Sequence, residues 1–219
     1  MKLATVAGVT AGVGGAAIGG SILLKNSNSY PAIEELISKS KTKILVKDSD
    51  TKGWTALWDV YKKENTNNGL GKDTWRLEGW ESSSKTTNIL TSYKSKCFSL
   101  AKEKVKDADD QKYKEFVSKC ARNKTVADLL AGSTLLSSDA GNKEQWKERF
   151  KKYKALKTQN TSYPIKEITL GDSDVETDDQ HLKKIQDGCD KAWNREVDGT
   201  ESEQSILDIK KWCSSETTI

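Results

Sequence analysis

Apolar residues follow two patterns along this chain of 219 residues, one continuous and one periodic. Residues 3–24 form an uncharged run of mostly small and aliphatic side chains, bounded by Lys2 and Lys25. Beyond it, apolar side chains recur three or four positions apart among charged residues, which is the spacing of amphipathic helices. The pattern therefore predicts an all-α protein, with an apolar N-terminal helix followed by a helical body.

The uncharged run is long enough to cross a membrane. A helix of 22 residues rises about 33 Å, which matches the hydrocarbon core of a bilayer. We therefore expect residues 1–25 to form a signal-anchor, a transmembrane helix that contacts the bilayer through residues 3–24. A cleaved secretion signal and a soluble protein are the alternatives, although a signal peptide usually has a shorter apolar region.

Glycines in this run allow two further interpretations. Four of them recur at a spacing that would let two membrane helices approach closely and form a weak homodimer: Gly8, Gly12, Gly15 and Gly19. Residues 12–17 also fit the dinucleotide-binding pattern G-x-G-x-x-A, but that motif requires a preceding strand and a later acidic residue. Neither context is present, so no cofactor is expected.

The expected topology is a single pass through the cell membrane with an extracellular body, because the tail before the run is very short. Lysines at positions 25, 39, 41 and 43 oppose this orientation, since basic residues favour the cytoplasmic side. The orientation therefore stays open.

The body contains an internal duplication. The pattern W-x-x-x-[WF]-x-x-Y-K occurs twice at an offset of 92 residues, and the cysteines recur at offsets of 92 and 93. We therefore predict two similar helical units, residues 30–121 and 124–214. The aromatic positions fall on one helical face, so we expect them to form the structural core: Trp54, Trp58, Tyr61, Trp146, Phe150 and Tyr153.

Each unit has two cysteines placed evenly about a polar turn between helical patterns. An antiparallel helical hairpin would bring Cys97 level with Cys120, and likewise Cys189 with Cys213. Disulfides within each hairpin are therefore expected, and they would require an oxidising compartment. Four reduced thiols buried between helices are the alternative.

Composition adds a charge asymmetry. The body is polar, with 31% charged residues in the whole chain and a mean hydropathy of −0.71. Residues 172–219 hold 13 acidic and six basic residues, whereas the whole chain has a net charge of +4. Such asymmetry indicates either attraction between the two halves or contact with nucleic acid or a membrane surface. We expect the first and do not expect nucleic acid as a partner.

Candidate chemistry is sparse. His181 is the only histidine, and it follows an acidic run at residues 172–179 that departs from the calcium-loop pattern. We expect both to be solvated. No nucleophile, metal-ligand or paired-carboxylate motif indicates an enzyme, so no catalytic, cofactor-binding or metal-binding residue is assigned.

The apolar N-terminal run, the W-x-x-x-[WF]-x-x-Y-K motifs and the final Lys211-Trp212-Cys213 together resemble the paralogous surface protein families of haemotropic mycoplasmas. This resemblance implies a membrane-anchored surface protein that contacts host molecules or antibodies as a variable antigen. It implies no active-site residue. The alternative functions are a surface hydrolase that uses carboxylates and a cytoplasmic, membrane-tethered nucleic-acid binder.

Overall fold

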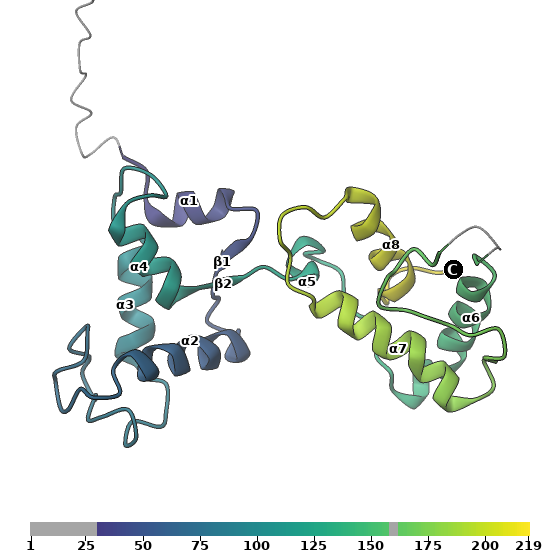
Figure 1. Ribbon diagram of the computed structural model, residues 1–219, viewed down its shortest axis with the longest axis horizontal. Helices are drawn as coiled ribbons and strands as arrows, with labels where there is room; N and C mark the ends of the chain where they lie inside the picture. The colour runs from purple at the N-terminus through teal and green to yellow at the C-terminus, as the bar shows by residue number, and fades with distance from the viewer. Residues whose placement is uncertain (1–29, 158–161) are drawn as a thin grey trace, which may run out of the picture.

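The computed structural model describes residues 30–157 and 162–219. Within these ranges the protein is mostly helical, and it forms two lobes joined end to end (Figure 1). The first lobe comprises residues 30–123 and the second comprises the described residues from 124 onward. Both predicted membrane-contacting features, the helix at residues 1–25 and its glycine face, lie outside the described residues.

The first lobe contains four helices and two short strands. They are α1 (Ile33–Lys39), β1 (Lys43–Leu45), α2 (Thr51–Glu64), α3 (Thr91–Ala101), α4 (Gln111–Cys120) and β2 (Ala121–Asn123). Strands β1 and β2 pair antiparallel, with Ile44 opposite Arg122. Helix α4 packs against α2 and α3, and α1 packs against α3.

The second lobe contains four α-helices and one 3₁₀ turn. They are α5 (Val126–Leu129), η2 (Ala140–Asn142), α6 (Lys143–Lys154), α7 (Asp179–Asn194) and α8 (Glu203–Cys213). Helix α7 is central, since α5, α6 and α8 all pack against it. No helix in the described part of the chain is long and apolar enough to cross a membrane.

Local sequence explains where several helices begin. Asp50, Asp110, Asp178 and Ser202 precede α2, α4, α7 and α8, and each side chain accepts a hydrogen bond from a backbone N–H of the first turn. These caps satisfy donors that would otherwise have no partner at a helix start. Thr125 caps α5 through a capping box with Asp128.

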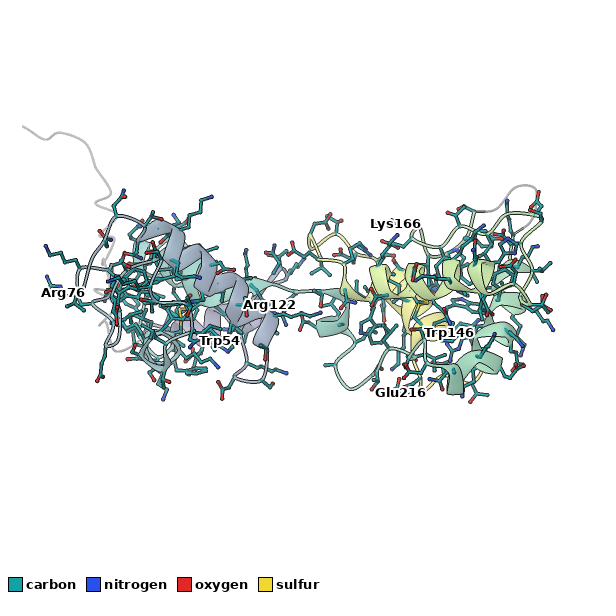
Figure 2. The ribbon with its side chains drawn as sticks, turned by 90° about the horizontal axis from the view of Figure 1, so that it is seen from below. Trp54, Arg76, Arg122, Trp146, Lys166 and Glu216 are labelled. Carbon is teal, nitrogen blue, oxygen red and sulfur yellow. A yellow bond between two sulfur atoms is a disulfide. The ribbon has the colours of Figure 1, made fainter. Side chains whose placement is uncertain are left out.

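Each lobe has its own hydrophobic core. One contains buried side chains between Ile33 and Ala121, and the other contains buried side chains between Val126 and Cys213. Figure 2 shows Trp54 in the first lobe, Trp146 in the second and Arg122 near the junction. The chain thus folds as two helical bodies whose cores do not merge.

The two lobes repeat the same backbone contacts at their entry points. Ala32 forms an isolated bridge with Lys104, and Thr125 forms one with Glu196. The adjacent amides of Val105 and Val197 donate to the carbonyls of residues 31 and 124, at 3.1 and 2.9 Å. Each lobe therefore begins by pairing its first residues with the segment that follows α3 in the first lobe and α7 in the second.

A second backbone contact, made by the residues that follow the last helix of each lobe, also repeats. The β1–β2 pairing of the first lobe corresponds to a single bridge between Leu135 and Ser214 in the second. The sequence pattern did not predict these strands, because three residues are too few to show a period of two.

Candidate functional site

The six aromatic residues expected to form the core are all buried. Trp54, Trp58 and Tyr61 lie on the inner face of α2, and Trp146, Phe150 and Tyr153 lie on the inner face of α6. The indole N–H groups of Trp54 and Trp146 each donate to a carbonyl at 2.9 Å, those of Lys47 and Ser137. These side chains stabilise the interior of each lobe. Because they are buried, they are not available to contact a ligand.

The two tyrosines also fix the long connections that follow α2 and α6. The hydroxyl of Tyr61 accepts from the backbone N–H of Trp75 at 3.0 Å and donates to the buried carboxylate of Asp73 at 2.5 Å. The hydroxyl of Tyr153 accepts from the N–H of Ile165, also at 3.0 Å. Burial and the hydrogen bond to Asp73 raise the pKa of Tyr61, so its hydroxyl keeps its proton.

Disulfides join Cys97 to Cys120 and Cys189 to Cys213, which are the pairs that the hairpin geometry selects. Their Cα–Cα distances are 5.5 and 5.4 Å, and all four side chains are buried. The first bridge links α3 to the end of α4, and the second links α7 to the end of α8. Each lobe is therefore closed across one helical hairpin.

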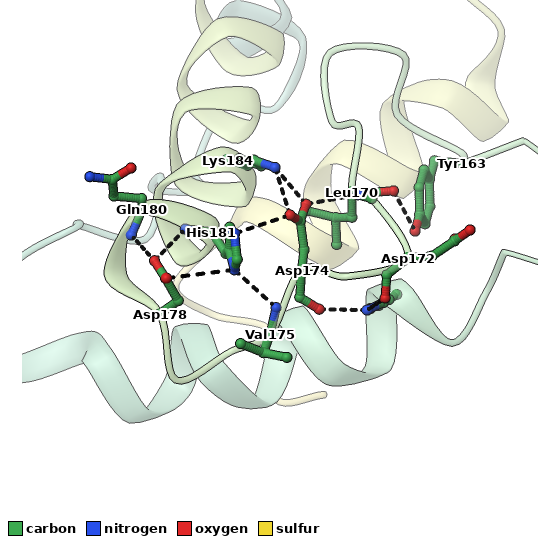
Figure 3. A network of polar contacts seen from close by, with 11 residues as sticks. Tyr163, Leu170, Asp172, Asp174, Val175, Asp178, Gln180, His181 and Lys184 are labelled. Atoms are coloured by element: carbon green, nitrogen blue, oxygen red, sulfur yellow. Dashed lines mark hydrogen bonds and ion pairs between the residues drawn. The ribbon is translucent and has the colours of Figure 1, made fainter.

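The only histidine belongs to a polar network in the second lobe (Figure 3). At its centre is Asp174, which is 3% exposed and lies in the connection between α6 and α7. Its carboxylate accepts hydrogen bonds from Lys184 and from the backbone N–H of Gly171, both at 2.7 Å, and His181 Nε2 lies 3.3 Å from it. The prediction that this acidic run is solvated holds for Asp172, Asp178 and Asp179, which are exposed, but it is wrong for Asp174. Hydrogen bonds from Lys184 and Gly171 make burial of the Asp174 carboxylate favourable.

The ring of His181 lies between two acidic residues. Its Nδ1 accepts a hydrogen bond from the backbone N–H of Val175 at 3.2 Å and lies 3.9 Å from Asp178, and its Nε2 lies 3.3 Å from Asp174. Lys184 and Gly171 lower the pKa of the Asp174 carboxyl below its usual value, and His181 adds to this effect. The carboxylate therefore stays ionised at neutral pH.

The chemistry open to this network is limited. Both ring nitrogens of His181 contact groups of the protein, and Lys184 and the Gly171 N–H hold the carboxylate of Asp174, so neither side chain is placed to exchange a proton with a ligand. Lys154 closes the network from α6 by donating to the carbonyls of Asp172 and Asp174. The arrangement fastens the acidic connection to α6 and α7.

A second polar cluster lines a hollow of about 310 Å³ in the same lobe. Arg195 lies between two carboxylates, with Nε 2.9 Å from Glu167 and Nη1 3.1 Å from Glu201. The Nε contact is an ion pair without the alignment of a hydrogen bond. Because Arg195 engages both carboxylates, the pair differs from the free carboxylates that a hydrolase requires.

Arg149 is a third buried charge, and sequence reasoning missed its role. Its guanidinium donates to the carbonyls of Trp212 and Ser214, both at 2.8 Å, and of Thr217 at 2.7 Å. Burial lowers the pKa of this guanidinium. The residue fastens the segment after α8, and the corresponding position in the first lobe, at the offset of 92, is Leu57.

Arg122 connects the two lobes. Its Nε contacts the Asp50 carboxylate of the first lobe at 2.6 Å, and its Nη1 contacts Asp128 of the second at 2.6 Å. The hydrogen bond to Asp128 raises the pKa of Arg122, with Asp50 contributing further. Burial alone would raise the pKa of Asp128, but Arg122 and the backbone N–H of Thr125 hold it below its usual value.

Comparison with protein-family models, with curated proteins and with solved structures finds no match for this chain. In the described residues, no group of three or more histidine, cysteine or acidic side chains is placed to hold a metal ion. The charged groups of each polar cluster contact oppositely charged or polar groups of the same chain.

Proposed function

We propose that this chain is a membrane-anchored display protein whose two-lobed body faces the outside of the cell and binds other molecules without catalysis. The observation that carries the proposal is the pair of buried disulfides, one in each lobe. Disulfides form and persist in oxidising compartments, whereas cytoplasmic thiols are kept reduced. An N-terminal helix over residues 3–24 would hold the body at the membrane.

The proposal includes a gene-level duplication, in which both lobes derive from one ancestral unit. Three repeated features support it: the entry bridges, the tyrosine contacts to the long connections, and the disulfides with separations of 23 and 24 residues. Two copies of one scaffold would present twice the exposed area on a single anchor. The polar outer surface could then vary while the buried aromatic residues preserve the fold.

The polar clusters favour binding over the alternative of a surface hydrolase. General acid or base catalysis needs a titratable group that can reach its substrate. Asp174, His181, Glu167 and Glu201 are instead engaged by neighbouring donors. The molecules that meet the surface would be host molecules or antibodies, as the resemblance to surface protein families implies.

The experiment is labelling of intact cells with a membrane-impermeant, amine-reactive biotin reagent. Exposed lysines on both lobes, such as Lys52 and Lys191, would be modified if the body faces outward. A cytoplasmic protein of the same cells serves as the control for leakage. Labelling of the body before lysis is the expected result, and labelling only after lysis would refute the proposal.

A further inference from the structure

A hollow of about 430 Å³ lies between the lobes, and we name it the interlobe groove. Its first wall is the end of α1 with the connection to β1. Its second wall comes from Lys124, the end of α5 and the α7–α8 connection, and the α1–β1 and α7–α8 connections approach each other in Figure 1. The lining residues that define its chemistry are Lys39, Lys41, Lys124, Leu129, Gly199 and Glu201.

Direct contacts hold the two walls together. The backbone N–H of Lys124 donates to the carbonyl of Thr42 at 2.8 Å, and its ammonium donates to the carbonyl of Ser40 at 2.7 Å. Gly199, with a φ of +87°, packs so closely that an added Cβ would lie 3.2 Å from the Thr42 methyl group. These contacts hold the two walls of the groove in a fixed position relative to each other.

The lining is positive. Lys39 and Lys41 are exposed, and neither makes an ion pair within the part of the chain that the structure describes. The one lining carboxylate, Glu201, is 8% exposed and is held by Arg195 and by the N–H groups of Asp198 and Gly199. Three lysines, Lys39, Lys41 and Lys124, therefore line the groove against one carboxylate that Arg195 already neutralises.

We propose that the interlobe groove binds a sulfated saccharide, an assignment that rests on the proposed outward orientation of the body. Lysine ammoniums suit sulfate groups as point charges. Leu129, which is 42% exposed, offers an apolar contact for the face of a sugar ring. No aromatic side chain lines the groove, so single-stranded nucleic acid would find no surface for base stacking.

The test uses the full chain in detergent micelles and a heparin-derived hexasaccharide, with affinity measured by calorimetry. The double variant Lys39→Ala/Lys41→Ala is expected to weaken binding by about tenfold or more and to make it less salt-dependent. The control, Lys52→Ala/Lys63→Ala, removes the same charge from exposed positions of α2 without ion pairs and should bind within about twofold of the parent chain.

Several outcomes would overturn the proposal. Equal loss in both double variants would show attraction to overall charge alone, and unchanged binding in both would place the ligand elsewhere. Equal binding of the desulfated hexasaccharide, or better binding of a DNA oligonucleotide of equal charge or of phosphatidylserine vesicles, would reject a sulfated saccharide. If the hexasaccharide binds in the groove but the body is protected from labelling in cells, both the display function and the saccharide assignment are refuted. If the body is labelled but does not bind the hexasaccharide, only the saccharide assignment is refuted.

Discussion

Single residues in this protein act mainly by satisfying buried polar groups. Arg149 and Arg122 join segments far apart in the sequence, and Asp174 joins the connection before α7 to α7 itself. Periodicity reveals which apolar side chains turn inward, but it does not indicate which charged residues follow them. The sequence therefore marks the acidic run around Asp174 but does not predict the contacts that these three residues make.

The Asp174 network makes a pH-dependent prediction. Asp174→Asn should lower the free energy of unfolding by about 1–2 kcal/mol at pH 7, because the amide cannot accept as well from Lys184 and His181. Since the folded-state pKa of Asp174 is lowered, its contribution is present above the unfolded pKa near 3.9 and is lost as pH falls through the folded value.

Urea unfolding at a series of pH values measures this contribution. The difference between the parent chain and Asp174→Asn should shrink in strong acid. Asp172→Asn is the matched control, because the Asp172 side chain is 98% exposed and should change stability little. A difference that grows as the pH falls would contradict the assignment.

Arg149 allows the two lobes to be compared at one position. Arg149→Leu introduces the residue type found at position 57, but it should lower the free energy of unfolding by about 3 kcal/mol. The reason is that the carbonyls of Trp212, Ser214 and Thr217 would lose their donor. Denaturant unfolding checks the value, with the exposed Lys191→Leu on α7 as the control; equal stability of the two variants would show that the carbonyls find water instead.

At the scale of elements, helix positions and cysteine pairing follow from sequence, and the connections do not. The Trp, Phe and Tyr spacing on α2 and α6 identifies their buried faces, because a helix repeats every 3.6 residues. The connections at residues 65–90 and 155–178 carry no such repeat. Their contacts to Tyr61 and Tyr153, and that of Asp174 to Lys184, come from residues that no local pattern singles out. The pairing of β1 with β2 depends on closing a long loop, which no local pattern predicts.

Removing one disulfide should destabilise one lobe more than the other. Cys97→Ala/Cys120→Ala opens a loop with a sequence separation of 23 residues, which is expected to cost about 3 kcal/mol. Hydrogen exchange should then rise in α3 and α4 and change little in α7 and α8, because the two cores are separate. The reciprocal variant, Cys189→Ala/Cys213→Ala, is the control, and equal loss of protection in both lobes would mean that they unfold as one unit.

At the scale of the whole molecule, Arg122 is expected to restrain the lobes relative to each other. Arg122→Gln removes its ion pairs with Asp50 and Asp128, while the backbone connection through Lys124 remains. Small-angle scattering should show a broader distribution of distances between the lobes. The control is Arg76→Gln, which removes the same charge at the far end of the first lobe and should leave the scattering unaltered (Figure 2). Identical curves for the two variants would show that the backbone alone sets the arrangement of the two lobes.

The display function requires the body to lie outside the cell with both hairpins oxidised. The most direct measurement treats intact cells with a membrane-impermeant protease and maps the released peptides without reduction. We expect cleavage beyond residue 25, with Cys97 linked to Cys120 and Cys189 linked to Cys213. A body that is protected until the cells are lysed, with all four thiols free, would contradict the account.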